Sequence, residues 1–380
     1  MVNIYLDHAA TTPMHEEVIK EMTRIMTTVY GNPSSIHHFG RQADFELENA
    51  REEIAKAINA QPTEIIFNSG GTEGDNTALI QTALDKKEFG KHIISTNVEH
   101  SAVTHSLEYL ESLGFEVTYL PVDETGAISV EQIKESLRED TILVSVMYGN
   151  NEVGTMQPIK EIGDLLEGHQ ALFHTDAVQA FGTETIDVKE LKVDYLSVSG
   201  HKINGPKGVG LLYIKKGALV PVMLHGGEQE EKKRAGTENL AGIVGLAKAI
   251  TILTDEQKMV NREKYQMFKS IIIDKLVDSN VAFEINGDEN NYLAHILNIW
   301  IKGIPSNILL SKLDLLGFAI STGSACSAGN VAPSPIIKVM KKDYPEAAVE
   351  SIRISFGLGL NEDDIKLFAE KLITSIKSFI

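Results

Sequence analysis

Short apolar runs alternate with longer helical patterns along the first two thirds of the chain. The runs are rich in β-branched residues and are short enough to be strands buried on both faces. They occupy residues 64–67, 92–96, 141–147, 171–175, 195–199 and, after a Gly/Pro turn, 209–216. Because strands that alternate with helices form βα units, this pattern predicts an α/β fold with a mostly parallel sheet covered on both faces.

The pattern changes after about Thr254. Residues 255–278 form a long amphipathic stretch rich in Lys and Ile, which predicts a helix that links two domains. A predicted strand at 295–301 and a predicted helix at 306–317 follow. A last helix is expected after Asn361, which supplies an N-cap before an acidic first turn. The C-terminal part is therefore expected to be a small α+β domain.

Charge and composition narrow the function classes. The 380 residues include 35 basic and 53 acidic ones, and the net charge of -18 argues against non-specific nucleic-acid binding and favours basic protein partners. A single cysteine cannot form an intrachain disulfide, and residues 1–13 lack the features of a signal peptide, so a reducing cytoplasm is expected. The apolar stretch at 241–253 is too short to cross a bilayer, which predicts a buried helix and no membrane role.

Two glycines and a hydroxyl follow the first predicted strand, in the sequence FNSGGTEGDNTAL. Gly70 and Gly71 allow close approach of the backbone, and Thr72 offers a hydroxyl. The helix that follows presents free N–H groups and a positive dipole end, which favours a phosphate. An ordinary Gly-rich turn remains the alternative, because such motifs have real false-positive rates.

Two further strand ends carry polar groups. Asp176 and Gln179, in HTDAVQAFG, lie where open α/β sheets place their ligands, and an acid there suits a protonated pyridine nitrogen. On this segment alone, a helix N-cap is the favoured interpretation of Asp176. Lys202 lies between a predicted strand and a Gly-Pro turn, flanked by Ser199 and His201. A partly desolvated lysine there has a lowered pKa and forms a Schiff base, whereas the alternative is a surface lysine.

The only cysteine, Cys326, lies in the polar, small-residue sequence AISTGSACSAGNVAPSP. An accessible thiol there is partly ionised near neutral pH, and about twenty residues without strand-like character predict a loop long enough to move. A lone cysteine is more often a buried filler. His100 is a candidate for ring stacking and proton transfer, and Arg353 for clamping a carboxylate, against the alternatives of a structural histidine and a surface ion pair.

Together and in this order, the motifs from YLDHAATTP at Tyr5 to SIRISFGLG near the C-terminus resemble the cysteine desulfurase family, NifS/IscS-like, of fold-type I pyridoxal-phosphate enzymes. The resemblance implies an α/β fold in which a mostly parallel seven-stranded sheet is flanked by helices and joined to a small α+β domain. The large domain is expected at 14–256. The small domain is expected to combine 1–13 with 257–380 and to carry the cysteine loop at about 321–346.

The resemblance also implies a role for each candidate residue. The implied cofactor contacts are Gly71, Thr72, Ser199, His201 and Thr237 near the phosphate, with Thr237 reaching across a dimer interface, and His100, Asn151, Asp176, Gln179 and Lys202 around the ring. Asn151 and Arg353 are the implied substrate contacts. His100, Lys202 and Cys326 are the implied catalytic residues, and no resident metal is expected, although a transient contact of Cys326 with an iron–sulfur cluster stays open.

The activity implied is removal of sulfur from L-cysteine, which gives L-alanine and a persulfide on Cys326. The sulfur is expected to pass to acceptor proteins, an iron–sulfur scaffold or a tRNA or cofactor thiolase, and the enzyme to be a homodimer without direct nucleic-acid contact. Departures from the family pattern are Glu228 in place of a glycine and residues 231–233 (Glu-Lys-Lys) where Glu-Arg-Gly is common, which places charge near the expected entrance. The alternatives are a selenocysteine lyase or another pyridoxal-phosphate lyase or aminotransferase of this fold, and a non-catalytic scaffold.

Overall fold

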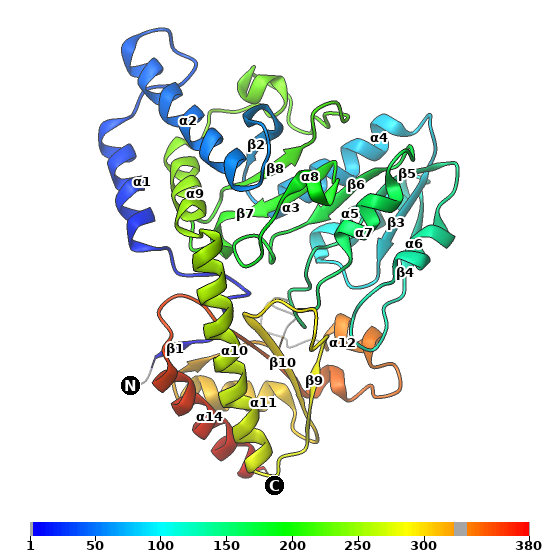
Figure 1. Ribbon diagram of the computed structural model, residues 1–380, viewed down its shortest axis with the longest axis vertical. Helices are drawn as coiled ribbons and strands as arrows, with labels where there is room; N and C mark the ends of the chain where they lie inside the picture. The colour runs from blue at the N-terminus through cyan, green and yellow to red at the C-terminus, as the bar shows by residue number, and fades with distance from the viewer. Residues whose placement is uncertain (1–2, 323–332, 380) are drawn as a thin grey trace.

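The computed structural model describes residues 3–322 and 333–379. Its larger part is built on a seven-stranded sheet (Figure 1). In spatial order the strands are β2 (Ile65–Asn68), β8 (Gly210–Ile214), β7 (Tyr195–Ser199), β6 (Leu172–Asp176), β5 (Thr141–Ser145), β3 (His92–Thr96) and β4 (Glu116–Leu120). β8 pairs antiparallel with both neighbours, and all other pairs are parallel. The predicted fold class is therefore confirmed.

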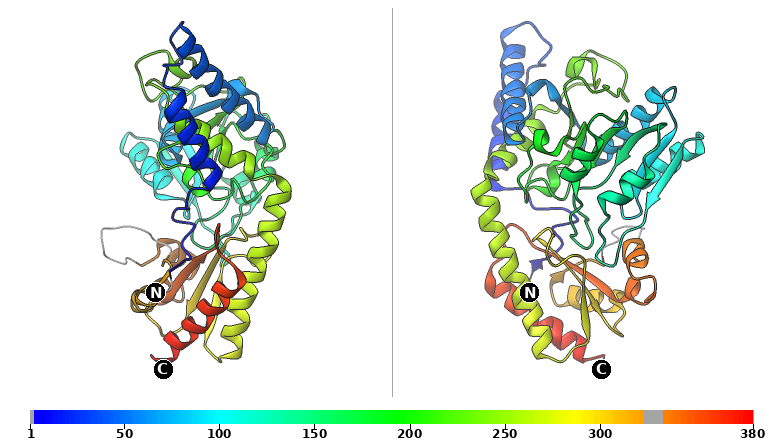
Figure 2. Two further views of the ribbon diagram at one scale, coloured as in Figure 1. Left: turned by 90° about the vertical axis from the view of Figure 1, so that its left-hand side faces the viewer. Right: turned by 45° about the vertical axis from the view of Figure 1, so that its right-hand side comes forward.

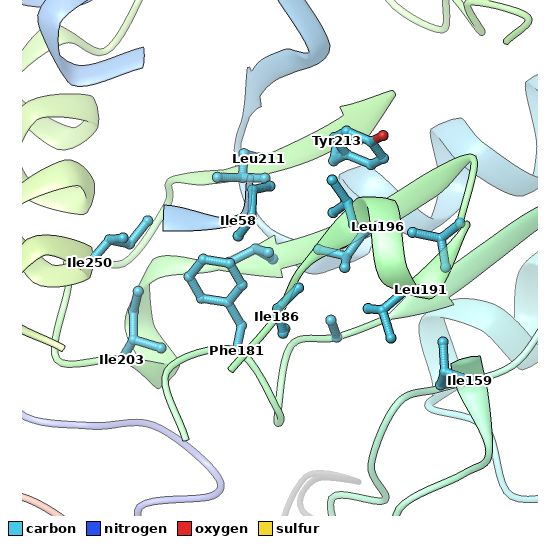
Figure 3. Packing of buried hydrophobic residues seen from close by; sticks show 14 of the residues in the cluster. Ile58, Ile159, Phe181, Ile186, Leu191, Leu196, Ile203, Leu211, Tyr213 and Ile250 are labelled. Atoms are coloured by element: carbon cyan, nitrogen blue, oxygen red, sulfur yellow. The ribbon is translucent and has the colours of Figure 1, made fainter. Parts of the chain in front are cut away.

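Alternate residues of β2 and β8 are buried in different apolar clusters, because side chains of a strand point to opposite faces of the sheet. In β2, Ile65 and Phe67 belong to one cluster and Ile66 to the other. Figure 3 shows part of the first cluster, where Phe181 and Ile186 pack below the sheet. Burial on both faces explains why these strands appear in the sequence as continuous apolar runs. The edge strand β4 is only partly buried, and the sequence pattern did not predict it.

Helices cover both faces of the sheet. They are α1 (Glu16–Thr28), α2 (His38–Ala57), α3 (Gly71–Asn76), α4 (Thr82–Lys86), α5 (Ser101–Ser112), α6 (Val130–Ser136), α7 (Ile159–Leu166), α8 (Val188–Leu191) and α9 (Leu240–Ile252). The apolar stretch at 241–253 is thus a largely buried helix, α9, as predicted. No helix among the described residues is long and apolar enough to cross a membrane.

The smaller part has a core of its own. Its elements are α10 (Asp255–Asp278), β9 (Phe283–Asn286), β10 (Ile296–Ile301), α11 (Ser306–Leu315), α12 (Pro335–Met340), α13 (Ala347–Glu350), β12 (Ser351–Ser355), α14 (Glu362–Lys377) and the pair β1 (Ile4–Tyr5) and β11 (Phe318–Ala319). The bounds of α10 are those predicted for the linking helix, and α14 lies along it (Figure 2). Asn361 caps α14 as predicted. We keep the division into residues 14–256 against 1–13 and 257–380 as a proposal, which the separate core supports.

The described part of the expected cysteine loop is not all loop, because α12 lies inside the span 321–346. Ser334 accepts a hydrogen bond from the N–H of Ile337 and caps this helix, and Pro335 starts it. Ile337 and Met340 are buried against the core of the larger part. The Pro-containing sequence that indicated a long loop therefore also contains a helix start.

We expect Phe368→Ala to lower the free energy of unfolding by roughly 3–5 kcal/mol, because Phe368 of α14 is fully buried against Phe318 and its removal leaves a cavity. Phe89→Ala is the matched control, since Phe89 is 66% exposed, and should change stability by less than about 0.5 kcal/mol. Urea unfolding followed by circular dichroism measures both. Equal losses in the two variants would contradict the burial described for α14.

Candidate active site

A cavity of about 720 Å³ lies where the larger and smaller parts meet the N-terminal segment. The predicted site residues that line it are Gly71, Thr72, His100, Asn151, Asp176, Gln179, Ser199, His201, Lys202 and Arg353. Most of them follow the carboxyl ends of parallel strands, which meet at one edge of the sheet. Sequence positions spread over nearly 300 residues are therefore brought together by the order of the strands.

Glycine is required in the turn between β2 and α3. Gly70 has a φ of +144°, a conformation that residues with a side chain rarely adopt, and a Cβ on Gly71 would lie 2.7 Å from Cγ2 of Val178. A Cβ on Gly74 would lie 2.8 Å from Oγ of Ser197. The turn and the start of α3 thus pack closely against the segment that follows β6 and against β7 itself, while the side chain of Thr72 stays exposed at the cavity.

Lys202 lies in the short helix η3 (Gly200–Lys202), directly after β7. Its Nζ donates hydrogen bonds to the carbonyl oxygens of Ala9 at 2.5 Å and Ala10 at 2.8 Å. Burial, together with the positive charge of Arg353, lowers the pKa of Lys202 to about 8. The surface-lysine alternative is therefore wrong, and the neutral share of this amine near physiological pH, about a fifth, is far larger than that of a free lysine.

Asp176 ends β6 and is buried at the cavity wall. Its Oδ1 accepts a hydrogen bond of 2.9 Å from the N–H of Val178 within a turn, and the next helix begins only at Val188. The helix-cap interpretation of Asp176 is therefore wrong. Burial raises the pKa of Asp176, and the neighbouring carboxyl of Asp75 raises it further. Gln179 lies beside it and donates from Nε2 to the carbonyl of Ala9 at 2.9 Å.

Arg353 lies in β12 and is 1% exposed, so the surface ion-pair alternative is wrong. Its Nη2 lies 2.9 Å from Oδ1 of Asp7, and its Nη1 donates to the carbonyl oxygen of Asn151 at 2.7 Å. A buried guanidinium that faces a cavity is suited to binding a carboxylate in two-point geometry.

The two histidines of the site differ in environment. His100 is the N-cap of α5, where Nδ1 accepts from the N–H of Ala102 at 3.1 Å, and its side chain is exposed at the cavity. His201 lies within hydrogen-bond distance of Thr11, with Nδ1 and Oγ1 3.1 Å apart. Burial lowers the pKa of His201 to about 4, so this ring is neutral at physiological pH.

Among the described residues, one predicted site residue is not brought to this cavity. Thr237 is exposed between η4 (Gln229–Lys232) and α9 and is not among the residues lining it. Cys326 lies outside the described residues. The charged departures at Glu228 and Glu231 line a different cavity, of about 250 Å³ beside α2. Within one chain they are therefore not at the entrance of the Lys202 cavity, where the sequence interpretation put them.

Sequence reasoning missed three acidic residues of the site. Asp7, which pairs with Arg353, lies in the quoted motif YLDHAATTP, and Asp75 lies in FNSGGTEGDNTAL. Glu99, next to His100, also lines the cavity. Their place in these motifs was the available signal, but only the packing shows that Asp75 and Glu99 are buried.

We expect the Lys202 amine of the cofactor-free protein to react with a small aldehyde faster as the pH rises to about 8 and to level off above it, because only the neutral amine attacks. Borohydride trapping with peptide mass analysis measures Lys202 modification. In Arg353→Gln the midpoint should move to higher pH, since a positive charge that disfavours protonation is gone. A midpoint near the ordinary lysine value of 10.5 in the unmodified protein would refute the assignment.

Comparison with known proteins agrees with this geometry. Residues 4–368 match the family model described as aminotransferase class-V. A putative cysteine desulfurase IscS 1 from Bacillus subtilis (strain 168) is 54% identical over 99% of both chains. The cysteine desulfurase IscS of Dictyoglomus turgidum is 45% identical over 95% of this chain and 91% of its own.

Solved structures show the same likeness. A NifS-like protein superposes with a TM-score of 0.92 at 34% identity over the whole of both chains. The structure titled SspA in complex with cysteine gives a TM-score of 0.82 at 33% identity, over 93% of this chain and 99% of that one. The chain therefore belongs to the class-V aminotransferase family, within its group of pyridoxal-phosphate-dependent cysteine desulfurases.

Proposed function

We propose that this protein takes sulfur from free L-cysteine, releases L-alanine and carries the sulfur as a persulfide on Cys326 to acceptor proteins. The observation that carries the proposal is the convergence of two buried groups and one partly buried amine in one cavity. These are the carboxyl of Asp176, the amine of Lys202 and the guanidinium of Arg353. A carboxylate, an amine and a guanidinium are the groups needed to hold a protonated pyridine, an aldehyde and an amino-acid carboxylate.

The residues of the cavity fit pyridoxal phosphate. Asp176 is a buried acid for the ring nitrogen, and Lys202 is a buried amine with a lowered pKa for the aldehyde. In our assignment Gln179 would hold the phenolic oxygen, and the exposed His100 would stack on the ring. Gly71, Thr72, Ser199 and His201 form the proposed phosphate contacts, with Thr237 of a second copy. When bound, the cofactor supplies a ring that withdraws electrons from the substrate Cα.

Lys202 is the proposed acid and base at the substrate. As a free amine with a pKa near 8, it can accept the Cα proton and return a proton later at neutral pH. The carbonyl oxygens of Ala9 and Ala10 orient its Nζ at the cavity wall. Desolvation thus favours the neutral amine that this step needs.

Arg353 is the proposed clamp for the substrate carboxylate. In the substrate-free chain its charge is matched by Asp7, and its orientation is fixed by the carbonyl of Asn151. A substrate carboxylate must share the guanidinium with Asp7 or replace it. Because the guanidinium is buried, removing it leaves the incoming carboxylate without a partner, which is costly.

Cys326 is the proposed sulfur acceptor. Its thiolate attacks the substrate sulfur, so an S–S bond forms while the C–S bond breaks. The substrate carbon receives the electron pair and then a proton, which yields alanine. A second thiolate on an acceptor protein, an iron–sulfur scaffold or a thiolase for tRNA or cofactors, takes the outer sulfur by the same chemistry. A cytoplasmic location is part of the proposal, since a reducing compartment keeps the single cysteine a thiol.

An apolar surface on α1, α2 and their connection supports the proposed homodimer. These two helices project from one edge of the larger part (Figure 1). The exposed apolar side chains there are Ile19, Met26, Tyr30, Ile36, Phe39 and Phe45. An apolar patch of this kind marks a protein interface. In such a dimer, the exposed Thr237 of one copy would reach the Lys202 cavity of the other copy.

We expect Cys326→Ser to abolish persulfide formation, because the serine hydroxyl is not a sulfur nucleophile at neutral pH. Incubation of the unmodified holoenzyme with L-cysteine should add the mass of one sulfur to the Cys326 peptide. Lys202→Ala should lose both the visible band of bound cofactor and all turnover. Equal alanine release by Cys326→Ser and the unmodified enzyme, with no sulfur adduct in either, would instead favour a lyase, and parallel assays with selenocysteine would identify it.

We expect Arg353→Gln to raise the KM for L-cysteine by about 10- to 100-fold, because the variant loses one charge-assisted interaction with the substrate carboxylate. Arg262→Gln is the matched control, because Arg262 pairs with Glu184 and is not among the residues lining the Lys202 cavity. Steady-state kinetics of alanine formation measure both variants. An unchanged KM in Arg353→Gln would remove Arg353 from the substrate site.

A further inference from the structure

Asp75 is a buried carboxyl group at the wall of the active-site cavity for which the proposed reaction gives no role. It lies in α3, just after the glycine turn, and is 1% exposed. Its Oδ1 has no hydrogen-bond partner among the described residues and lies 3.4 Å from Nε2 of His174. A buried carboxylate without full hydrogen bonding is unfavourable, so the environment favours the protonated form.

The carboxyl of Asp75 faces the carboxyl proposed to hold the ring nitrogen. Oxygen atoms of Asp75 and Asp176 and a ring nitrogen of His100 all lie within 4.8 Å of one another. Two carboxylates at such a distance in a desolvated site do not both stay ionised, because their repulsion is poorly screened. Burial raises the pKa of both groups, and the charge of Asp75 raises that of Asp176 further.

The other charged groups around Asp75 do not neutralise a second negative charge. His174, beside Asp75 on β6, is fully buried, and burial lowers its pKa to about 4, so it is neutral. Ser197 of β7 offers a hydrogen bond but no charge. Glu99, which precedes α5, is a third carboxyl, and burial raises its pKa to about 8. The exposed His100, whose ring nitrogen lies within 4.8 Å of both carboxyls, lowers the pKa of Asp176, and the charge of Asp176 raises the pKa of Lys202.

We propose that Asp75 is a positioning residue of the cofactor site: in its neutral form it donates its carboxyl proton to Asp176 in a hydrogen bond. The pair then carries one negative charge, held on Asp176, where the ring nitrogen of pyridoxal phosphate would bind. The inference rests on the proposed function, because Asp176 has this role only if the cavity holds that cofactor. Asp75 acts through Asp176 and does not itself contact the substrate.

The charge state gives Asp75 a defined effect on the site. A donated hydrogen bond stabilises ionised Asp176, so it opposes the effect of burial, which disfavours the charge. The glycine turn places Asp75 at this position, because Gly74, next to it, packs against Ser197. Replacement by Asn keeps a donor without a titrating proton, whereas replacement by Ala removes the donor. These two variants therefore separate the hydrogen bond from the charge.

The first test is infrared spectroscopy of the cofactor-free protein at pH 6.5, where protonated carboxyl groups absorb separately from carboxylates. We expect the protonated-carboxyl signal to lose one group in Asp75→Asn, and to lose a different one in Glu99→Gln, the comparison variant with an equally buried acid. An unchanged signal in Asp75→Asn would show that Asp75 is ionised and would overturn the inference. This measurement does not depend on any sulfur-transfer activity. A negative outcome would therefore count against the role of Asp75 without bearing on the proposed function.

The second test is the pH dependence of pyridoxal-phosphate affinity, followed by cofactor absorbance. We expect Asp75→Asn to keep the acid-side midpoint of the unmodified protein, since its amide still donates to Asp176. Asp75→Ala should move this midpoint to higher pH and weaken binding at pH 6 by about tenfold, the loss of a hydrogen bond to a charged group. Identical midpoints in Asp75→Ala and the unmodified protein, with native circular dichroism, would overturn the donation.

Discussion

The site depends on a contact between the N-terminal segment and two buried cations. The carbonyl oxygens of Ala9 and Ala10 accept from Lys202, and Asp7 pairs with Arg353. Residues 7–10 thus supply hydrogen-bond acceptors to Lys202 of the larger part and a counter-ion to Arg353 of the smaller part. Without these acceptors the partly buried Lys202 amine would lose both carbonyls and the buried Arg353 guanidinium would lose the Asp7 carboxylate, and such a loss is costly for a desolvated cation. The same segment fixes the orientation of Gln179 through the Ala9 carbonyl.

Much of this architecture could be predicted from periodicity alone. The buried strands are continuous apolar runs because both of their faces are covered, and the second half of α10 places Tyr265, Phe268, Ile272 and Leu276 on one buried side. The cap at Asn361 is a local interaction between neighbours in sequence, so it too could be predicted. The polar residues at the carboxyl ends of β6 and β7 could be placed together because parallel strands share an edge.

Other features depend on contacts that no local pattern encodes. The edge strand β4 is half exposed and lacks an apolar run. The burial of Asp75 and Glu99 follows from packing between α3, α5 and the sheet, and their sequence neighbours are those of ordinary helix starts. Asp176 looked like a helix cap because its hydrogen bond to Val178 has the same local form in a turn. These positions lie in or beside motifs that the sequence shows. The protonation state of their carboxyl groups, however, depends on burial, which only the tertiary structure determines.

The position of the N-terminal segment also has a consequence for biosynthesis. Ile4 pairs with Phe318, and Asp7 reaches Arg353, so the two ends of the chain meet across more than 300 residues. Contacts of such high sequence separation form late in folding, since loop closure must precede them. A nascent chain whose Lys202 has just left the ribosome still lacks Arg353 and β12. The amine can therefore be surrounded by its final partners, and have its pKa lowered, only after nearly the whole polypeptide has left the ribosome.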